Sequence, residues 1–221
     1  MSGLQDIVDY ATSIEINRRK LVGIQFTRNQ IVRVGETPSR NPWRFKVKHD
    51  RVIPYSQARA LIEELDRLDR ALPQQITMSS NSKLSYLFAY QGAMTLTQRN
   101  DLIITSFIGN QLILRNLTTI TPLSVMFKAG DFIQVEGYPY PFTVINQVNR
   151  PGSGDTVTVT VHRPNFISDS VVDKKIIVGN AVNFYMLCTN MPTYAFIRGG
   201  ANALVQFTGD FELHEYTGLE V

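Results

Sequence analysis

The sequence predicts a mainly β protein, a β-sandwich or barrel, with one flanking amphipathic helix. Residues 156–161 alternate between threonine and valine without interruption, which is the period of a strand with one buried and one exposed face. Turns rich in glycine and proline separate several other short apolar runs. Only the stretch 56–72 has clear helical periodicity. Strands joined by short turns favour antiparallel sandwiches and barrels.

The N-terminal third predicts one short helix and three strands. Apolar residues follow helical spacing within 4–14, and 20–34 is typical of a strand pair joined by a turn. Between 43 and 48, Trp43, Phe45 and Val47 alternate with basic residues. We therefore expect a strand whose aromatic side lies in the core and whose cationic side is exposed.

The helix predicted at 56–72 begins with Ser56, whose hydroxyl is expected to cap a first-turn amide, and ends before Pro73. One face is apolar, and acidic residues precede basic ones at i,i+4 on the other. Such a helix is expected to cover a sheet of its own subunit or a neighbouring subunit, and the sequence leaves both open. The apolar stripe consists of Leu61, Ile62, Leu65, Leu68 and Leu72.

The segment 127–164 is predicted to be a self-contained antiparallel unit. Strands are expected at 132–135, 142–145 and 156–161, with 151–155 as the hairpin loop because its glycines and proline favour a tight turn. This unit carries no catalytic pattern, which favours an assembly component over an enzyme. Weaker signals predict a strand at 84–91, a hairpin turn at Gly109-Asn110, and strands at 176–178, 182–188 and 203–213, the last with a bend or bulge at Gly209-Asp210.

Composition limits the classes that remain. A hydrophobic content of 43% is ordinary for a globular core, so we do not expect extensive disorder. No apolar run approaches the roughly 18–20 residues that span a bilayer, and the first twenty residues lack an export-signal pattern, so no membrane anchor is expected. The single Cys188 excludes an internal disulfide. It lies in an apolar run, where we expect it to be buried and unreactive, in a reducing compartment.

Positive charge is concentrated between Arg18 and Arg51, where ten lysines and arginines face two acidic residues. This segment is +8, and because the whole chain is +3 the remainder is −5. Such asymmetry predicts a partner surface, met either by the acidic part of a second copy or by nucleic acid. The geometry of the strand at 43–48 favours the first, since a base-stacking platform needs aromatic and basic residues on one face. The candidate partner-interface residues are Arg18, Arg19, Lys20, Arg28, Arg44, Lys46, Lys48 and Arg51.

No catalytic or metal-binding pattern is present. The three histidines, His49, His162 and His214, are far apart and follow no ligand spacing, so neither a metal nor a cofactor is expected. Phosphate-binding glycine loops and a nucleophile elbow are also missing from the sequence. Glu212 and Glu215 are expected on a solvated face, where they would have no acid–base role.

Taken together, six segments resemble structural tail proteins of bacteriophages, and more narrowly baseplate or tail-tube-end components of contractile-tailed phages. They are INRRKLVGIQFTRN, NPWRFKV, YSQARALIEELDRLDR, FKAGDFIQVEGYPYPFTV, GDTVTVTVHRP and ALVQFTGDFELHEY. The resemblance implies a β-sandwich or barrel of tail-tube type formed by 1–96 and 165–221, with an inserted small β-barrel at 97–164.

The same resemblance implies a non-enzymatic virion component, part of an oligomeric ring in the baseplate hub or tube end. Its partners would be further copies of itself and other tail or baseplate proteins, and it would join the virion tail after assembly in the host cytoplasm. The family has no catalytic residues, so none are expected. The alternative is a nucleic-acid-binding β-barrel protein that uses the basic segment 18–51, and a tail-associated hydrolase is the least supported interpretation.

Overall fold

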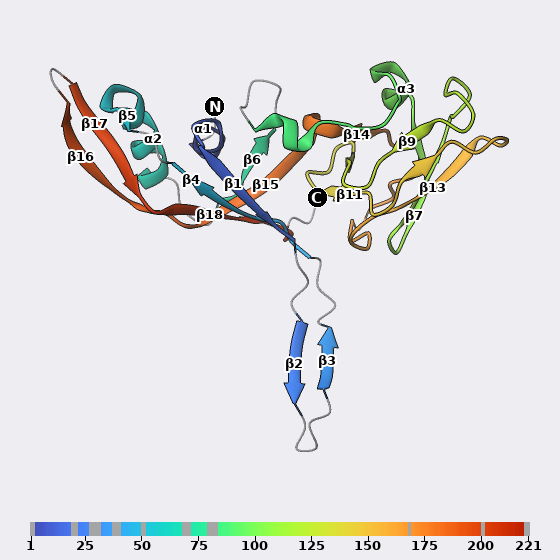
Figure 1. Ribbon diagram of the computed structural model, residues 1–221, viewed down its shortest axis with the longest axis horizontal. Helices are drawn as coiled ribbons and strands as arrows, with labels where there is room; N and C mark the ends of the chain where they lie inside the picture. Colours follow the sequence, from blue (N-terminus) through green and yellow to red (C-terminus); the bar gives the residue numbers. More distant parts are fainter. Residues whose placement is uncertain are drawn as a thin grey trace.

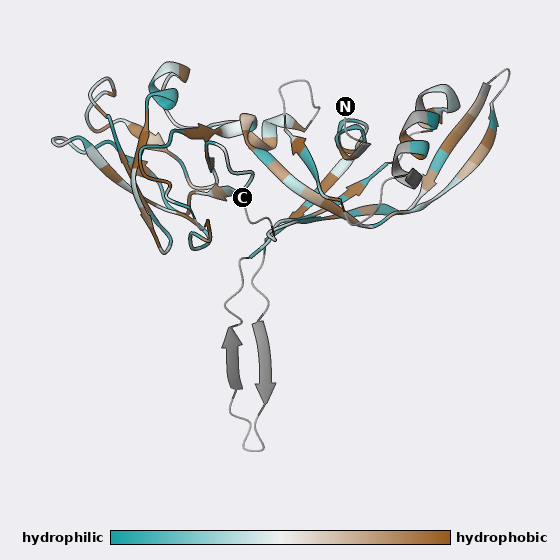
Figure 2. Ribbon diagram, turned by 180° about the vertical axis from the view of Figure 1, so that it is seen from behind, coloured by the Kyte–Doolittle hydropathy of each residue, from teal (hydrophilic) through white to brown (hydrophobic). Residues whose placement is uncertain are grey.

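The structure is a computed structural model and describes residues 3–18, 22–26, 32–36, 41–49, 52–67, 72–78, 84–167, 169–199 and 202–218. It is mainly β, with 45% strand and 15% helix, so the predicted mainly β composition is confirmed. Two lobes lie at opposite ends of the long axis, and hydrophobic residues gather in each of them (Figures 1 and 2). Each lobe has its own hydrophobic core.

The first lobe is built on a five-stranded antiparallel sheet. Its strand order is β1 (Ser13–Asn17), β4 (Arg44–Lys48), β18 (Asp210–Glu215), β15 (Asn183–Asn190) and β6 (Gln74–Thr77). Alternate residues of β4, β15 and β18 point into the first core, including Phe45, Phe184 and Phe211. Helix α1 (Gly3–Asp9) covers this sheet with Leu4 and Ile7.

The sheet curls into a half-barrel, and two of its neighbouring strands, β15 and β18, connect to a further pair of strands. After a break at 191–192, β15 leads into β16 (Thr193–Gly199), and β17 (Asn202–Thr208) leads into β18 across Gly209. Gly209 has a φ of +134°, and a Cβ there would lie 3.3 Å from a carbon of Pro192. The bend predicted at Gly209 is present, and it turns β16 and β17 beneath α2 (Figure 1). The short strand β5 (Ile53–Pro54) pairs with β17, so that β16, β17 and β5 form a three-stranded sheet.

Helix α2 (Tyr55–Arg67) is the predicted amphipathic helix, with Ala58, Leu61 and Ile62 buried against the first core. It packs against β17 of its own chain. Ser56 is not its cap, because the helix follows β5 directly and includes Ser56 in its first turn. Leu72 is 61% exposed rather than part of the apolar stripe. The following proline disfavours helical backbone at that position.

Three small sheets enclose the second core. The first has the order β13 (Thr156–Thr160), β8 (Gln111–Arg115), β7 (Ile103–Ile108), and the second β11 (Pro141–Thr143), β10 (Phe132–Val135), β14 (Ile176–Val178). The third pairs β12 (Val148–Asn149) with β9 (Val125–Phe127). The valines of 156–161 are all buried, as their alternation predicts, and Gly109 turns β7 into β8 with a φ of +56°.

The segment 127–164 is not self-contained, contrary to its predicted organisation. Strand β13 pairs with β8, and β10 pairs with β14 as well as β11. The loop 151–155 therefore joins strands of different sheets and is not a hairpin loop. The local turn chemistry was visible in the sequence, but the partner of β13 lies more than forty residues earlier in the chain.

Other local elements depart from the prediction or were not predicted. Residues 84–91 form a 3₁₀ helix, η1 (Ser85–Phe88), rather than a strand, and only Phe88 among its residues is buried. Helix α3 (Leu96–Asn100) begins with a complete capping box, in which the side chains of Thr95 and Gln98 each accept the backbone N–H of the other residue. A second 3₁₀ helix, η2 (Gly179–Ala181), precedes β15. Strands β2 (Val22–Phe26) and β3 (Val32–Glu36) form the hairpin predicted at 20–34, although its turn lies outside the described residues.

Residues of the second lobe also enter the first core. Phe132 of β10 packs against Trp43, with ring centroids 5.4 Å apart, and the indole N–H of Trp43 donates to the Pro141 carbonyl at 2.9 Å. The second core in turn draws on Met94 and Val178, which lie on either side of 97–164. The domain boundaries at 96/97 and 164/165 stay a prediction.

Candidate interaction surfaces

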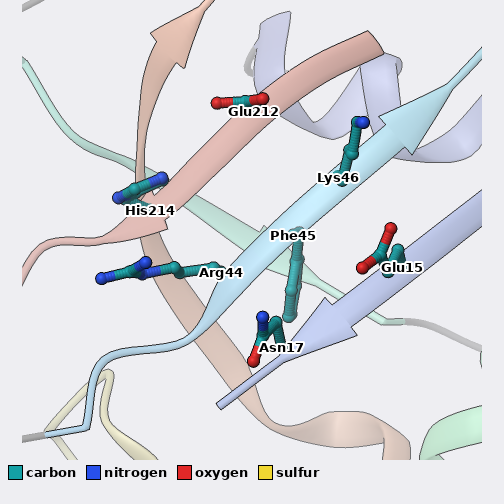
Figure 3. Close-up of a pocket in the computed structure, with 7 residues that line it drawn as sticks. All are labelled: Glu15, Asn17, Arg44, Phe45, Lys46, Glu212 and His214. Atoms are coloured by element: carbon teal, nitrogen blue, oxygen red, sulfur yellow. The ribbon is translucent and has the colours of Figure 1, made fainter. Parts of the chain in front are cut away.

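Three rows of polar side chains cross the outer face of the five-stranded sheet, opposite the first core, and Figure 3 shows the first two of them. Strand β4 runs between β1 and β18, so each outward residue of β4 has a direct neighbour on either side. A depression of about 270 Å³ lies over the first two rows. The rows are Asn17, Arg44 and His214; Glu15, Lys46 and Glu212; and Ser13, Lys48 and Asp210.

The basic residue of the second row is neutralised by carboxylates of the second and third rows. Lys46 lies between Glu15 and Glu212 and forms an ion pair with Asp210 at 3.2 Å. The hydrogen bond and charge of Asp210 raise the pKa of Lys46, with smaller contributions from the two glutamates. Trp43, Phe45 and Val47 are buried on the other face, as predicted. The acidic groups facing Lys46 therefore belong to the same chain. They come from β1 and β18, which lie outside the basic segment 18–51.

The first row has a different character. Arg44 is half-buried, and its direct neighbours, Asn17 and His214, carry no carboxylate. Within the described part of the chain, no ion pair involves Arg44. Burial first, and the charge of Arg44 second, lower the pKa of His214 below its usual 6.5, while Glu212 opposes this shift. His214 is therefore neutral at pH 7, and Arg44 supplies the only full charge of the row.

The remaining predicted interface residues do not join this surface in the described structure. Arg18 lies on the other side of the sheet, with its guanidinium carbon 5.5 Å from the centroid of the Trp43 ring. Arg19, Lys20, Arg28 and Arg51 lie outside the described residues.

A buried ion pair between the lobes is the main polar feature that the sequence analysis missed. Arg163 donates to both carboxylate oxygens of Glu215, at 2.5 and 2.7 Å, and neither side chain is exposed to solvent. Arg163 also donates to the Pro141 carbonyl at 2.9 Å, and the backbone N–H of Trp43 donates to Glu215 at 3.0 Å. The predicted solvated position of Glu215 is therefore wrong.

The alternation of inward and outward residues along a strand could have located both members of this pair. Glu215 continues the buried face of Phe211 and Leu213, and Arg163 continues that of Val159 and Val161. A charged residue at an inward position requires a partner of opposite charge, because an unpaired buried charge is costly. The same alternation correctly places His214 on the outer face.

The histidines do not meet. His162 lies between the lobes, 5.0 Å from the Trp43 ring, and its Nδ1 accepts the Thr143 backbone N–H at 3.0 Å. Burial, with the charges of Arg163 and Arg18, lowers the pKa of His162 to about 2. His49 contacts the Ile7 carbonyl through Nε2 at 2.6 Å, which ties α1 to the end of β4. Both imidazoles are neutral structural groups.

Cys188 is only partly buried, although it packs against the first core. Its thiol donates to the Asn190 carbonyl at 3.4 Å. The expected full burial is therefore wrong, because β15 leaves the covered part of the sheet at this point and its pairing with β18 shifts register between Cys188 and Asn190.

The edges of the curled sheet are protected unequally. Beside β6, the Gln5 side chain accepts the Thr77 backbone N–H at 2.8 Å and donates to the Thr77 carbonyl at 3.1 Å, as a neighbouring strand would. Strand β16 pairs only with β17, and no described strand covers its other side. It also carries large exposed apolar residues, since Phe196 is 60% and Ile197 37% exposed. These adjacent residues point to opposite faces.

Among the described residues, no three histidine, cysteine or acidic side chains are grouped as a metal site, and no helix is long and apolar enough to cross a bilayer. No family model matches the chain, and no curated protein sequence matches it.

Proposed function

We propose that the protein is a non-enzymatic structural component of a contractile phage tail, a subunit of an oligomeric ring in the baseplate hub or at the end of the tube. The open edge of β16 is the observation that carries this proposal. Within this proposal the chain works in the virion after assembly in the host cytoplasm, and its partners are further copies of itself and neighbouring tail or baseplate proteins. The six segments that resemble phage tail proteins support it from the sequence.

An exposed edge strand with apolar side chains is an aggregation hazard unless another chain covers it. Strand β16 is the longest edge strand among the described residues, at seven residues. Phe196 packs against Tyr55 of α2, with centroids 5.4 Å apart, yet most of its ring stays exposed. A strand of a neighbouring subunit added here would satisfy the backbone groups of β16 and cover both apolar residues.

A second open edge allows an interface in which two different surfaces of the subunit meet. Strand β1 is an edge of the five-stranded sheet, whereas β16 is an edge of the three-stranded sheet β16-β17-β5, and no described strand pairs with the outer side of either strand. Joining β16 of one subunit to β1 of the next would be a head-to-tail contact, which closes into a ring when the rotation between subunits allows it. Because the Gln5 contact covers Thr77 of β6, β1 remains as the open edge of the five-stranded sheet, while β5, the other edge of the sheet of β16, has only two residues. The first lobe then acts as a tail-tube-type β domain, and the second as the inserted small β-barrel.

The nucleic-acid alternative finds less support on the described surface. Lys46 is ion-paired with Asp210 and lies between two glutamates, so the second row repels a phosphate backbone as much as it attracts one. A salt-dependent binding titration with DNA and RNA separates the two functions, because nucleic-acid binding through basic residues weakens steeply with salt.

Light scattering after size exclusion tests ring formation directly. We expect the wild-type chain to form a closed oligomer, and Phe196→Lys and Ile197→Lys to dissociate it without unfolding. Ile108→Lys is the matched control, since Ile108 is 77% exposed at the end of β7, away from β16. Antibody labelling of phage tails in negative-stain images places the protein in the virion. A chain that is monomeric at every concentration and unlabelled on tails rules the proposal out.

A further inference from the structure

We propose that the Arg44 end of the depression on the outer sheet face binds a carboxylate, with the Arg44 guanidinium as a bidentate donor and His214 as a second donor. This inference does not depend on the proposed function. It follows from the register of three strands, which places Arg44 directly between Asn17 and His214. Arg44 and His214 lie side by side at one end of the site (Figure 3).

The row of Arg44 is built to donate hydrogen bonds to an anion. A guanidinium has N–H donors in a planar fork that matches a carboxylate, and it accepts none. Residues directly opposite on antiparallel strands have Cβ atoms about 4.5–5.5 Å apart, so one ligand group can reach both Arg44 and His214. Both side chains are half-buried, and partial loss of water strengthens a charge-assisted hydrogen bond.

The neighbouring row does not fill this role. Glu15 and Glu212 are the nearest carboxylates on this face, and both lie beside Lys46. Lys46 receives electrostatic stabilisation from these two glutamates and from Asp210. The second row has two carboxylates and one ammonium, a net charge of −1, so it offers no cation to an anionic ligand, and the positive charge of Arg44, which forms no ion pair among the described residues, remains for a ligand.

Charge and size together define the ligand class. His214 is neutral at pH 7, so the first row has a single positive charge and matches a monoanion. A phosphate dianion would leave an excess negative charge close to Glu212. The depression of about 270 Å³ is smaller than a typical pocket for a drug-sized molecule, so it fits a small acid or the carboxylate of one side chain.

Titration with acetate tests the site in the intact chain. Sodium acetate replaces sodium chloride at constant ionic strength while NMR follows the imidazole signals of His214, assigned with His214→Gln. We expect a saturable shift with a millimolar dissociation constant. Arg44→Gln should weaken binding by about tenfold or more, because a hydrogen bond to a charged group is lost.

Two variants and one competing anion make the result specific. Lys46→Gln and Arg198→Gln also remove a positive charge but lie outside the first row, so acetate affinity should stay within about twofold of wild type. The proposal is overturned if acetate has no more effect than chloride, if Lys46→Gln weakens binding as much as Arg44→Gln, or if phosphate binds at least as tightly as acetate.

A dilution series identifies the source of the carboxylate. If it comes from a second copy of the chain, the His214 signals shift with protein concentration in the absence of acetate, and added acetate reverses that shift. If it comes from a small acid, the signals are independent of protein concentration and respond only to acetate. Both results require the Arg44 site, and neither occurs in Arg44→Gln if the assignment is correct.

Discussion

Removing one member of the buried Arg163–Glu215 pair should destabilise the protein far more than removing both. In Arg163→Met the carboxylate of Glu215 loses two hydrogen bonds, at 2.5 and 2.7 Å, and stays fully buried. In Glu215→Gln the buried guanidinium loses its counter-charge. Each single change leaves an uncompensated charge where no water reaches it.

The expected magnitude follows from this burial. Breaking a buried pair by removing one partner costs about 3–5 kcal/mol, which corresponds to a fall in melting temperature of about 6–20 °C for a chain of this size. In the double variant Arg163→Met/Glu215→Gln no buried charge remains. The new glutamine carbonyl still accepts the Trp43 backbone N–H, and the Pro141 carbonyl keeps the Trp43 indole N–H. We therefore expect the double variant to lie within about 2 kcal/mol of wild type.

Urea unfolding followed by tryptophan fluorescence measures all four proteins. Trp43 is the single tryptophan of the chain, is 1% exposed and contacts both the ion pair and Phe132 across the lobes. Its emission therefore reports on the junction. If the two single losses simply add in the double variant, the pair has no coupling energy and the reasoning fails.

Three further changes test other parts of the structure. The pKa of His162 is about 6.5 in the unfolded chain but about 2 in the native protein, so the unfolded chain binds the proton first as the pH falls. The free energy of unfolding, measured with urea, should therefore fall by about 2–3 kcal/mol from pH 6.5 to 4.5. His162→Gln should make the free energy of unfolding less dependent on pH over this range. Gln5→Ala should speed hydrogen exchange at the Thr77 amide by about tenfold or more, whereas unchanged exchange would show that the Gln5 contact does not protect β6. Gly209→Ala should cost more than about 1 kcal/mol in urea unfolding, because φ is +134° and Pro192 is close; a neutral result would contradict the assigned bend.

Features that depend on neighbouring residues could be predicted from the sequence. The buried face of 156–161, the turn at Gly109 and the bend at Gly209 follow from local periodicity and glycine conformations. The basic strand is also placed correctly, with its aromatic side inward. Its electrostatic surroundings could not be predicted, because the carboxylates beside Lys46 come from β1 and β18, and β18 lies more than 160 residues further along the chain.

The incorrect strand at 84–91 shows how alternation can mislead. Leu84, Tyr86 and Phe88 suggest one buried face, but Tyr86 is 68% exposed in the structure. Leu84 and Phe88 are four residues apart, and these are the two that pack against the first core. A short apolar pattern fits both a strand and a helical turn until a partner strand is identified, and the order of strands in a sheet depends on contacts between distant segments.

The strength of the junction bears directly on how the chain would act in an assembly. A charge pair without solvent exposure, the Trp43–Pro141 hydrogen bond and Phe132 inserted into the opposite core together hold the two lobes in one orientation. Both strands of the proposed contact, β16 and β1, belong to the first lobe, so the junction sets the position of the second lobe relative to the ring and not the contact itself. A single change at Arg163 that leaves the chain folded should therefore leave the oligomer distribution unchanged in light scattering. A broadened distribution would show that the second lobe also takes part in the ring contact.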